Sequence, residues 1–494
     1  MHRAGLTLAH YDARAHLVVA RRVFDSLIPG WQQVGAVWLP LPHLLDMLPV
    51  QIDWLYRTGY SGVAISIGSM ALAAWAITTL VQRATGDWIG GVVAAALMML
   101  NPDILYLQST PMSEPLLFAT TFLAIALVSR WAMDVAPRTT AGPVSPSQRP
   151  TTMAAGWALV AACLTRYEAW PIVALTIALA AAILLRRGWS IDETWRAVRG
   201  LALWPLWAVA AFLVNSKVTV GSWFISSGFF VAENAAQGHP WTAWLQVWDG
   251  LLQLAGTALP WLACVAAAGI VWTFGRSRER AGLIVVLALA GAAALPWYAY
   301  FKGHPLRVRY DVPLIAAAAA VAGVGVGLLP RRARAAAGIA IVAIAAWQAP
   351  PFDLSAGVVK ESQRDTRNAI GRRAVTAYLL SHWDRQPIMM SMGSLAHYMH
   401  DLSAYGFNVA DFVHEGNGEI WKYALRHPSP FVDWIAVEEH AEGGDEIYHH
   451  GQLDPRFFVG YERVAEGGGV ALYRRAPHPR AGSDLTDVRN GSRR

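Results

Sequence analysis

Long apolar runs dominate the first 349 residues of this 494-residue chain. A run of roughly 20 apolar residues is long enough to cross the hydrocarbon core of a bilayer as a helix. The pattern therefore predicts a polytopic α-helical membrane protein. About ten spans are expected, at residues 60–82, 88–106, 115–133, 153–168, 171–185, 200–216, 250–274, 281–299, 311–329 and 334–349.

The composition agrees with this class. Only 15% of the residues are charged, whereas soluble domains carry roughly 25%. Residues 1–349 hold 24 of the 40 lysines and arginines but 15 of the 34 acids. The positive net charge of the chain therefore comes from the loops between membrane spans, where basic residues indicate which side of the membrane a loop lies on. The sequence has no basic stripe interleaved with aromatic residues, and a nucleic-acid partner is not expected. Cys163 and Cys264 both lie in apolar runs, which argues against a disulfide framework or a cysteine metal site.

The least regular part of the pattern is residues 153–185, where "TRYEAWP" interrupts one apolar stretch. Arg166 and Glu168 would be costly at the middle of a bilayer. Pro171 suits the first turn of a new helix. We therefore expect two helices that meet at a membrane surface.

The arginine distribution predicts the orientation of the spans. One set of alternate loops carries 14 basic residues and the opposite set of short loops carries five. Because basic loops face the cytoplasm, residues 1–59, the "TRYEAW" turn, the 217–249 loop, "YFKGHPLRVRYDVP" and the C-terminal region are expected on the outer side of a plasma (inner) membrane. "MHRAGLTLAH" lacks the apolar core of a signal peptide, so a first transmembrane helix upstream of Met1 is expected.

Four regions follow from this pattern. Residues 1–59 are expected to form an extracytoplasmic first loop with an interfacial amphipathic helix, followed by a transmembrane domain at 60–349. Beyond 350, strand-like pieces such as "PIMMSM", "DWIAVEEH" and "GGGVALYRR" alternate with helical and turn signals. These predict a small extracytoplasmic α/β or α+β domain at 350–476 and a disordered tail at 477–494. A Pro/Ser/Thr-rich stretch at 135–152 predicts a flexible cytoplasmic loop.

The stretch "AHYDARAHLVVARRVFDSLIPG" stands out in the first loop. Its apolar positions from Ala15 to Leu27 fall mostly on one helical face, with Arg14 and Arg21 elsewhere, which is typical of a helix lying at a membrane interface. Two interpretations of Asp12 are open. It is either the N-cap of this helix or a general base held at the membrane surface.

This stretch resembles the first-loop motif of bacterial GT-C glycosyltransferases, the group of the lipid-A aminoarabinose transferase and the protein O-mannosyltransferases. The shared features are an acid, a histidine or aromatic residue four positions later, an Ala-Arg pair and a Pro-rich re-entry, here "WLPLPHLL". Two positions depart from the pattern: Ala13 replaces a frequent second acid, and Trp38–His43 lacks a frequent lysine. The resemblance implies a GT-C-like fold, Asp12 as the catalytic base and inversion at the anomeric carbon.

Two acids flank the turn in "NPDILYLQSTPMSEPLL". Glu114 precedes Pro115 at the start of a span, where an acid also suits the helix dipole. The resemblance implies that an acid of this loop lies in the active-site cavity. Glu114 is therefore expected to contact the acceptor or a metal ion, with His16 and Asp103 as further candidates.

Arg166 has two interpretations. It either pairs with Glu168 for structure or binds a lipid-linked phosphate, since a guanidinium matches phosphate oxygens bidentately. The densest basic cluster on the expected outer side is in "YFKGHPLRVRYDVP". It could bind anionic lipid headgroups, Asp311 or the C-terminal domain, or the phosphate of a polyprenyl carrier, with two arginines alternating on an extended piece. Its members are Lys302, His304, Arg307 and Arg309.

The sequence thus favours a glycosyltransferase that moves a sugar from a polyprenyl-phosphate-linked donor to a glycan, lipid or protein acceptor at the outer face of the membrane. No P-loop or dinucleotide fingerprint indicates a cytosolic nucleotide site. A divalent metal ion is left open as the only cofactor. The alternatives are a transporter or flippase of lipid-linked sugars, which would need ionisable residues at mid-membrane, and a non-catalytic envelope assembly protein.

Overall fold

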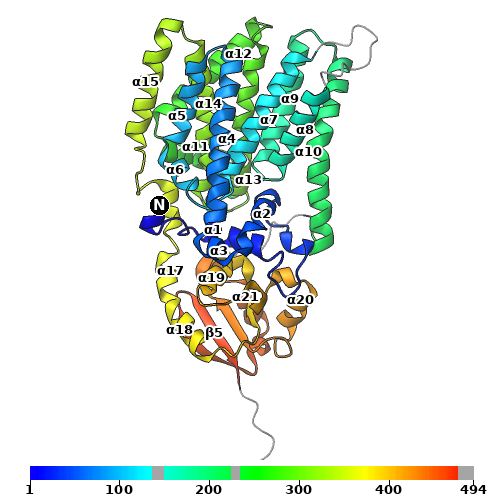
Figure 1. Ribbon diagram of the computed structural model, residues 1–494, viewed down its shortest axis with the longest axis vertical. Coiled ribbons are helices and arrows are strands. Elements are labelled where there is room, and N and C mark those ends of the chain that lie inside the picture. Colours follow the sequence, from blue (N-terminus) through cyan, green and yellow to red (C-terminus); the bar gives the residue numbers. More distant parts are fainter. Residues whose placement is uncertain (136–148, 224–233, 477–494) are drawn as a thin grey trace, which may run out of the picture. The chain divides into compact units, whose positions relative to one another are not determined.

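The computed structural model describes residues 1–135, 149–223 and 234–476. The chain divides into two compact units (Figure 1). The membrane unit comprises Met1–Arg367 and Ala396–Ala410, and the C-terminal unit comprises Asn368–Leu395 and Asp411–Arg494. The division falls after residue 367 rather than at the expected 350. The expected tail at 477–494 and most of the expected loop at 135–152 lie outside the described residues.

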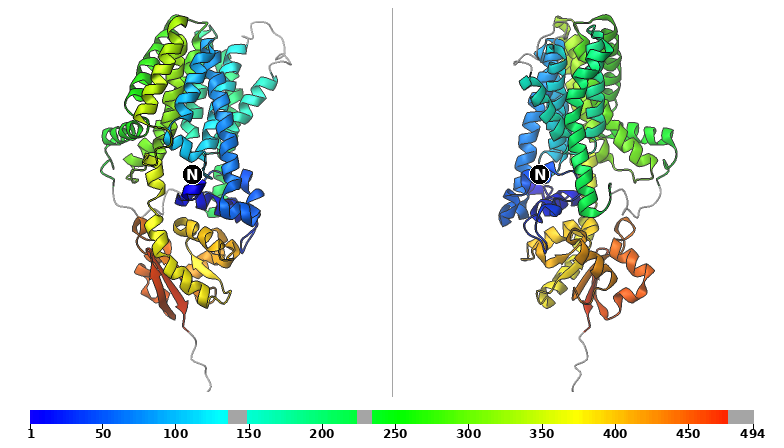
Figure 2. Two further views of the ribbon diagram at one scale, coloured as in Figure 1. Left: turned by 60° about the vertical axis from the view of Figure 1, so that its left-hand side comes forward. Right: turned by 90° about the vertical axis from the view of Figure 1, so that its right-hand side faces the viewer.

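The membrane unit is helical, and its long helices run side by side in two turned views (Figure 2). In the described part of the chain, seven helices are long and apolar enough to cross a membrane. This confirms the polytopic helical class, but the count of about ten spans is not confirmed. The seven are α4 (Tyr60–Thr85), α7 (Glu114–Asp134), α9 (Ala169–Arg186), α10 (Ile191–Val220), α12 (Ala258–Arg276), η4 with α13 (Ala281–Ala293 and Ala294–Phe301) and η5 with α14 (Val308–Asp311 and Val312–Leu328).

Further helices complete the membrane unit. Three of them fall on expected spans: α5 (Trp88–Met99), α8 (Arg149–Cys163) and α15 (Arg331–Gln348). The "TRYEAWP" prediction is confirmed, because α8 ends at Cys163 and α9 begins at Ala169. The other elements of this region are α6 (Pro102–Leu107), α11 (Pro240–Ala255) and α16 (Gly357–Ser362).

Small residues allow the central helices to approach closely. A Cβ atom on Gly90 of α5 would lie 2.5 Å from the carbonyl oxygen of Gly323 of α14, a distance that no side chain tolerates. Apolar burial gives little driving force between helices in lipid, so such close backbone packing is what stabilises their association. Helix α14 is accordingly the most enclosed of the seven, with 89% of its apolar window buried.

The first 59 residues form short helices around a buried one. These are η1 (His2–Ala4), α1 (Tyr11–Arg21), η2 (Trp31–Val34), α2 (Leu41–Asp46), η3 (Pro49–Gln51) and α3 (Asp53–Thr58).

Helix α1 is buried along most of its length, including Arg14 and Arg21. The side of the helix that carries these two arginines is therefore buried as well. Arg14 donates to Asp365 at 2.8 Å, and Arg21 donates to Asp25 at 2.8 Å. Because paired charges can be buried, a polar helical face does not have to face solvent.

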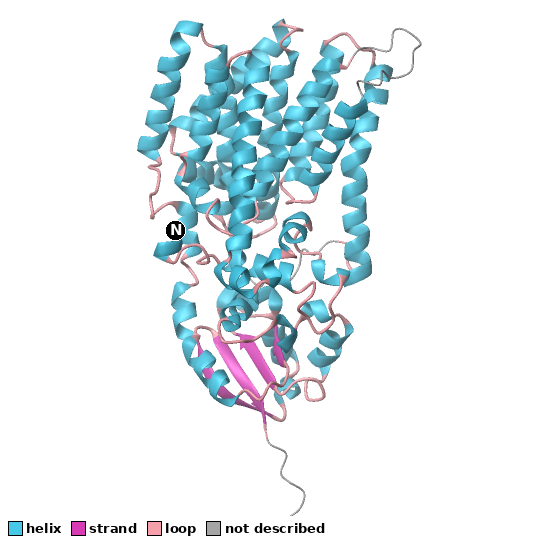
Figure 3. Cartoon of the chain, in the orientation of Figure 1, coloured by secondary structure: helices cyan, strands magenta, loops and turns pink. Residues whose placement is uncertain are grey.

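The C-terminal unit contains a five-stranded sheet in the order β2-β1-β3-β5-β4 (Figure 3). Strand β1 is parallel to β2 and β3, whereas β5 is antiparallel to β3 and β4. The strands expected in "PIMMSM", "DWIAVEEH" and "GGGVALYRR" are confirmed as β1, β3 and β5. The five strands are β1 (Ile388–Met390), β2 (Phe412–Val413), β3 (Trp434–Glu438), β4 (Tyr461–Gly467) and β5 (Val470–Arg475).

Helices accompany this sheet along the chain. Buried side chains of the central strands, such as Ile435 and Val437, pack with Trp421 and Ile447 from two of them. The helices are α17 (Thr366–Gly371), α18 (Arg373–His382), α19 (Met392–Ser403), η6 (Val409–Asp411), η7 (Glu415–Asn417), α20 (Glu419–Arg426), η8 (Ala441–Gly443), α21 (Glu446–Leu453) and η9 (Pro455–Phe458). Residues of α19 from Ala396 onward belong to the membrane unit.

Candidate functional site

The start of helix α1 presents Asp12. The N-cap is His10, whose Nδ1 accepts a hydrogen bond from the backbone N–H of Asp12 at 3.1 Å. Asp12 is therefore the second residue of the helix, and its interpretation as the N-cap is wrong. Because an imidazole supplies the cap, the carboxylate of Asp12 is left to bind elsewhere.

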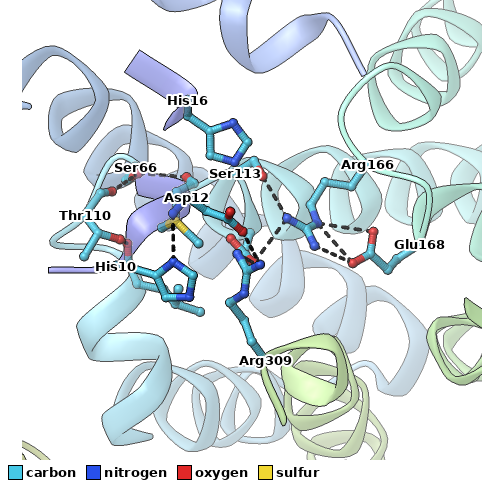
Figure 4. A network of polar contacts seen from close by, with 12 residues as sticks. His10, Asp12, His16, Ser66, Thr110, Ser113, Arg166, Glu168 and Arg309 are labelled. Carbon is cyan, nitrogen blue, oxygen red and sulfur yellow. Dashed lines mark hydrogen bonds and ion pairs between the residues drawn. The ribbon is translucent and has the colours of Figure 1, made fainter. Parts of the chain in front are cut away.

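Asp12 belongs to a cluster of three acids and two arginines, which we call the acid–arginine network (Figure 4). Arg309 donates to the carboxylate of Asp12 and, at 3.2 Å, to Oε1 of Glu114. Arg166 lies 3.2 Å from the same Glu114 oxygen and 2.6 Å from Oε1 of Glu168. The network thus joins Asp12 to Glu168 through alternating charges: Asp12, Arg309, Glu114, Arg166 and Glu168.

The network lies where helices begin or end. Asp12 is in the first turn of α1, and Glu114 is the first residue of α7. Arg166 and Glu168 occupy the turn between α8 and α9, and Arg309 lies in η5 directly before α14. Four separate segments therefore meet at the ends of the spans, and none of the five side chains comes from the middle of a span.

Hydrogen bonds brace the loop before α7. The hydroxyl of Ser66 in α4 donates to the carbonyl of Thr110 at 2.7 Å. Ser113, which directly precedes Glu114, accepts from Nη1 of Arg166 at 2.9 Å (Figure 4). Since α7 starts at Glu114, the positive end of the helix dipole also favours this carboxylate.

Burial makes the charges of the network depend on one another. The side chains of Arg309 and Glu114 are 5% and 1% exposed, and those of Asp12 and Arg166 are each 14% exposed. Burial alone would raise the pKa of Asp12, but the Arg309 guanidinium and the nearby histidines lower it to about 2. Burial likewise opposes the charge of Arg166, yet Glu114 and Glu168 raise its pKa above the usual value. Asp12 is therefore a carboxylate at neutral pH.

His16 lies one helical turn after Asp12, close enough to interact electrostatically with Asp12 and Arg309 (Figure 4). Its Nδ1 is 3.0 Å from Nε2 of His43, and its ring lies 4.2 Å from that of Trp38. Burial lowers the pKa of His16 to about 3, against the attraction of Asp12 and with the repulsion of Arg166. The ring is thus neutral, and its nitrogens can act only as one donor and one acceptor.

The structure brings together Asp12, Glu114, Arg166 and Arg309 of the residues expected to carry chemistry, with His16 beside them. Asp103 lies apart from them in its contacts: Oδ1 accepts the backbone N–H of Val358 at 2.7 Å and so holds the start of α16.

The residues of the basic cluster differ in their contacts. Lys302 lies over the ring of Tyr298 at 5.7 Å, and Nδ1 of His304 is 3.1 Å from the carbonyl of Pro305. The expected extended piece is wrong for Val308–Asp311, which forms the 3-10 helix η5. Arg309 belongs to this helix and contacts both Asp12 and Glu114 of the network.

Sequence reasoning missed three residues of this site. His10 caps α1, His43 holds His16, and Ser113 binds Arg166. The signals were weak: His10 and Ser113 are next to residues already singled out, and His43 lies in the Pro-rich "WLPLPH" segment.

Arg309 takes up part of the oxygen set that a divalent cation would use. It contacts Oδ2 of Asp12 and Oε1 of Glu114. Within the described ranges, no group of three or more His, Cys, Asp or Glu side chains is arranged to hold a metal ion.

Together, the apolar helices of the membrane unit and the small C-terminal sheet define a polytopic helical membrane protein with a small sheet-containing C-terminal unit. No family model matches the chain, and no curated protein matches it. Among solved structures, it is similar to ArnT from Cupriavidus metallidurans bound to undecaprenyl phosphate, with 15% identity, 95% of each chain covered and a TM-score of 0.50. This likeness confirms the expected fold.

Two further solved structures are similar at lower scores. The apo state of the same ArnT has 16% identity, covers 93% of this chain and 92% of its own, and has a TM-score of 0.45. The other is the oligosaccharyltransferase of Archaeoglobus fulgidus in complex with Zn and sulfate, with 11% identity and a TM-score of 0.46. The match covers 95% of this chain and 69% of the oligosaccharyltransferase chain.

Proposed function

We propose that this protein is a glycosyltransferase that moves a sugar from a polyprenyl-phosphate-linked donor to an acceptor at the outer face of the membrane. The observation that carries the proposal is the ionised carboxylate of Asp12 bound to the buried Arg309, at the ends of membrane-spanning helices. The fold shared with an ArnT that binds undecaprenyl phosphate supports the class of donor.

The proposed reaction is one displacement. Asp12 accepts the proton of an acceptor hydroxyl, whose oxygen forms a bond to the anomeric carbon of the donor sugar. The bond from that carbon to the phosphate oxygen breaks, and its electron pair leaves with the polyprenyl phosphate. Arg309 and Arg166 stabilise the charge that develops on this oxygen, because fixed cations in a water-poor site act strongly.

The contact between Asp12 and Arg309 explains how a weakly basic carboxylate can serve as the base. While Arg309 binds Asp12 alone, the pKa of Asp12 stays at about 2. A phosphate that shares Arg309 weakens this attraction and adds a negative charge, and both effects raise the pKa of Asp12. The base thus becomes stronger when the donor is bound.

The outer face and the plasma membrane belong to this proposal on the grounds of loop charge. The 14 basic residues of one loop set against five of the other support an extracytoplasmic network and C-terminal unit. Acceptors in this compartment are glycans, lipids or proteins, and prenyl tails would lie among the spans.

Two other functions make different demands. A transporter or flippase of lipid-linked sugars needs ionisable residues within discontinuous helices at mid-membrane, whereas the network gathers at helix ends. In a non-catalytic assembly protein, the ionised Asp12 would only stabilise the fold through its ion pair with Arg309. Neither alternative accounts for the network as well as sugar transfer does.

The test is sugar transfer by the purified chain in lipid nanodiscs, with a panel of synthetic polyprenyl-phosphoryl sugars. Asp12→Asn keeps the shape of the side chain but removes the base, so transfer should fall by roughly 100- to 10,000-fold with the donor still bound. Asp134→Asn is the matched control, because Asp134 is 61% exposed at the end of α7. Full transfer by Asp12→Asn would exclude Asp12 as the base, and translocation of the donors without transfer would favour the flippase.

A further inference from the structure

The acid–arginine network carries more negative than positive charge. It holds three carboxylates and two guanidinium groups. A donor phosphate adds at least one further negative charge to a site whose Arg309 and Glu114 side chains are almost fully buried. A phosphate can take the Nε–Nη2 edge of Arg166 only by replacing the carboxylate that already binds it, since like charges in a buried site repel strongly.

The arginine most completely occupied is Arg166. Its Nε donates to both oxygens of Glu168, at 3.1 and 3.2 Å, and its Nη2 donates to Oε1 of Glu168 at 2.6 Å. Its Nη1 lies 2.9 Å from the Ser113 hydroxyl and 3.2 Å from Glu114. All three nitrogens of Arg166 are thus engaged, and Glu168 takes the two-pronged edge that a phosphate would use.

Glu168 is well placed to be replaced. It occupies the N-cap position of α9, but its side chain makes no capping hydrogen bond. Instead, the carboxylate is turned to Arg166, two residues earlier in the same turn (Figure 4). The Glu168 side chain is 2% exposed, so bulk water does not compete with Arg166 for its carboxylate.

We propose that Glu168 is an internal competitor of the donor phosphate. Its carboxylate occupies Arg166 when no phosphate is bound, yields Arg166 to the incoming donor, and takes it back as the polyprenyl phosphate leaves. Glu168 thereby sets the affinity of the site for phosphate and speeds release of the lipid product. This role rests on the proposed function.

A purely structural role for Glu168 predicts the opposite outcome. If Glu168 only holds Arg166 in place, loss of its charge leaves a buried arginine poorly paired, and phosphate binding becomes weaker or stays the same. If Glu168 competes, Glu168→Gln keeps the shape and a hydrogen bond but removes the rival charge, and phosphate binding becomes tighter. A charge-assisted hydrogen bond is strong enough for a change of roughly ten- to a hundredfold.

The experiment measures binding of undecaprenyl phosphate, without sugar, to the full chain in nanodiscs of uncharged lipid. Glu168→Gln should lower the Kd by roughly ten- to a hundredfold, and in transfer assays it should lower both KM for the donor and kcat. Glu419→Gln is the matched control, because Glu419 is 70% exposed and pairs with the exposed Lys422. Its Kd should equal that of the wild type.

A second variant protects the test against loss of folding. Glu168→Asp keeps the charge but shortens its reach, so it should bind undecaprenyl phosphate more tightly than the wild type and less tightly than Glu168→Gln. An unchanged or higher Kd in the folded variants, with the wild type binding the lipid, would overturn the role of Glu168 alone. No binding of the lipid by the wild type would overturn the proposed function and this role with it.

Discussion

Replacing Arg14 with methionine should strongly destabilise the membrane unit. Nη1 of Arg14 donates to both carboxylate oxygens of Asp401 at 2.7 Å, and Nη2 donates to Asp365 at 2.8 Å. These two acids lie on either side of residues 368–395, which belong to the C-terminal unit. Arg14 thus joins the helix that carries Asp12 to the two stretches of the membrane unit that precede and follow this segment in the chain.

The size of the effect follows from the burial of each partner. The side chains of Arg14 and Asp365 are 8% and 10% exposed, whereas that of Asp401 is 34% exposed. Removing Arg14 leaves Asp365 as a buried charge whose other ion-pair partner is His397, at 3.6 Å, and breaking such a pair costs about 3–5 kcal/mol. Asp401 can take up water instead, so Asp401→Asn should cost only about 1 kcal/mol.

The assay is reversible unfolding in mixed micelles, with the free energy of unfolding compared for three variants. Arg14→Met should lose about 3–5 kcal/mol, Asp365→Asn nearly as much, and Asp401→Asn the least. The double variant Arg14→Met with Asp365→Leu should recover most of the loss, because it removes both buried charges. A loss below about 1 kcal/mol for Arg14→Met, or equal losses for Asp365→Asn and Asp401→Asn, would refute the reasoning.

Three further predictions concern the site and its supports. Arg309→Gln should reduce transfer at least about tenfold, measured as kcat/KM, because Arg309 binds both Asp12 and Glu114; an unchanged kcat/KM would contradict this. The pKa of Asp12 is lowered from 3.8 to about 2, so the ion pair should add about 2 kcal/mol of stability above pH 4 that is lost as pH falls toward 2, and unfolding of Asp12→Asn should lack this acid dependence. Asp103→Asn should lower the melting temperature but leave kcat unchanged, since Asp103 holds the backbone N–H of Val358; a selective loss of kcat would instead place Asp103 in the chemistry.

Several features of the fold could be predicted because they depend on local composition. Apolar runs predict membrane helices wherever the chain lies, and a charged turn with a proline predicts where one run divides, as found between Cys163 and Ala169. The strands β1, β3 and β5 could likewise be predicted from the short apolar segments in which they lie. A 3-10 helix is harder to predict, which is why the Arg307–Arg309 piece was expected to be extended.

Asp12 could be singled out because a short motif surrounds it, but its partner could not. Arg309 lies 297 positions later in the chain, and nothing near either residue indicates the other. The same is true of Arg166 and Glu114, which come from different loops. Their pairing depends on how the spans pack.

Helix α1 shows where the division lies between sequence and structure. The sequence by itself determined that this segment is helical, that it carries an acid at position 12 and that one side is polar. Only the tertiary structure decided that the polar side is buried, because the acids that neutralise Arg14 come from residues 365 and 401. A charged side chain can be buried at low cost only when an opposite charge pairs with it, and a partner that is distant in the sequence is brought close only by the tertiary fold.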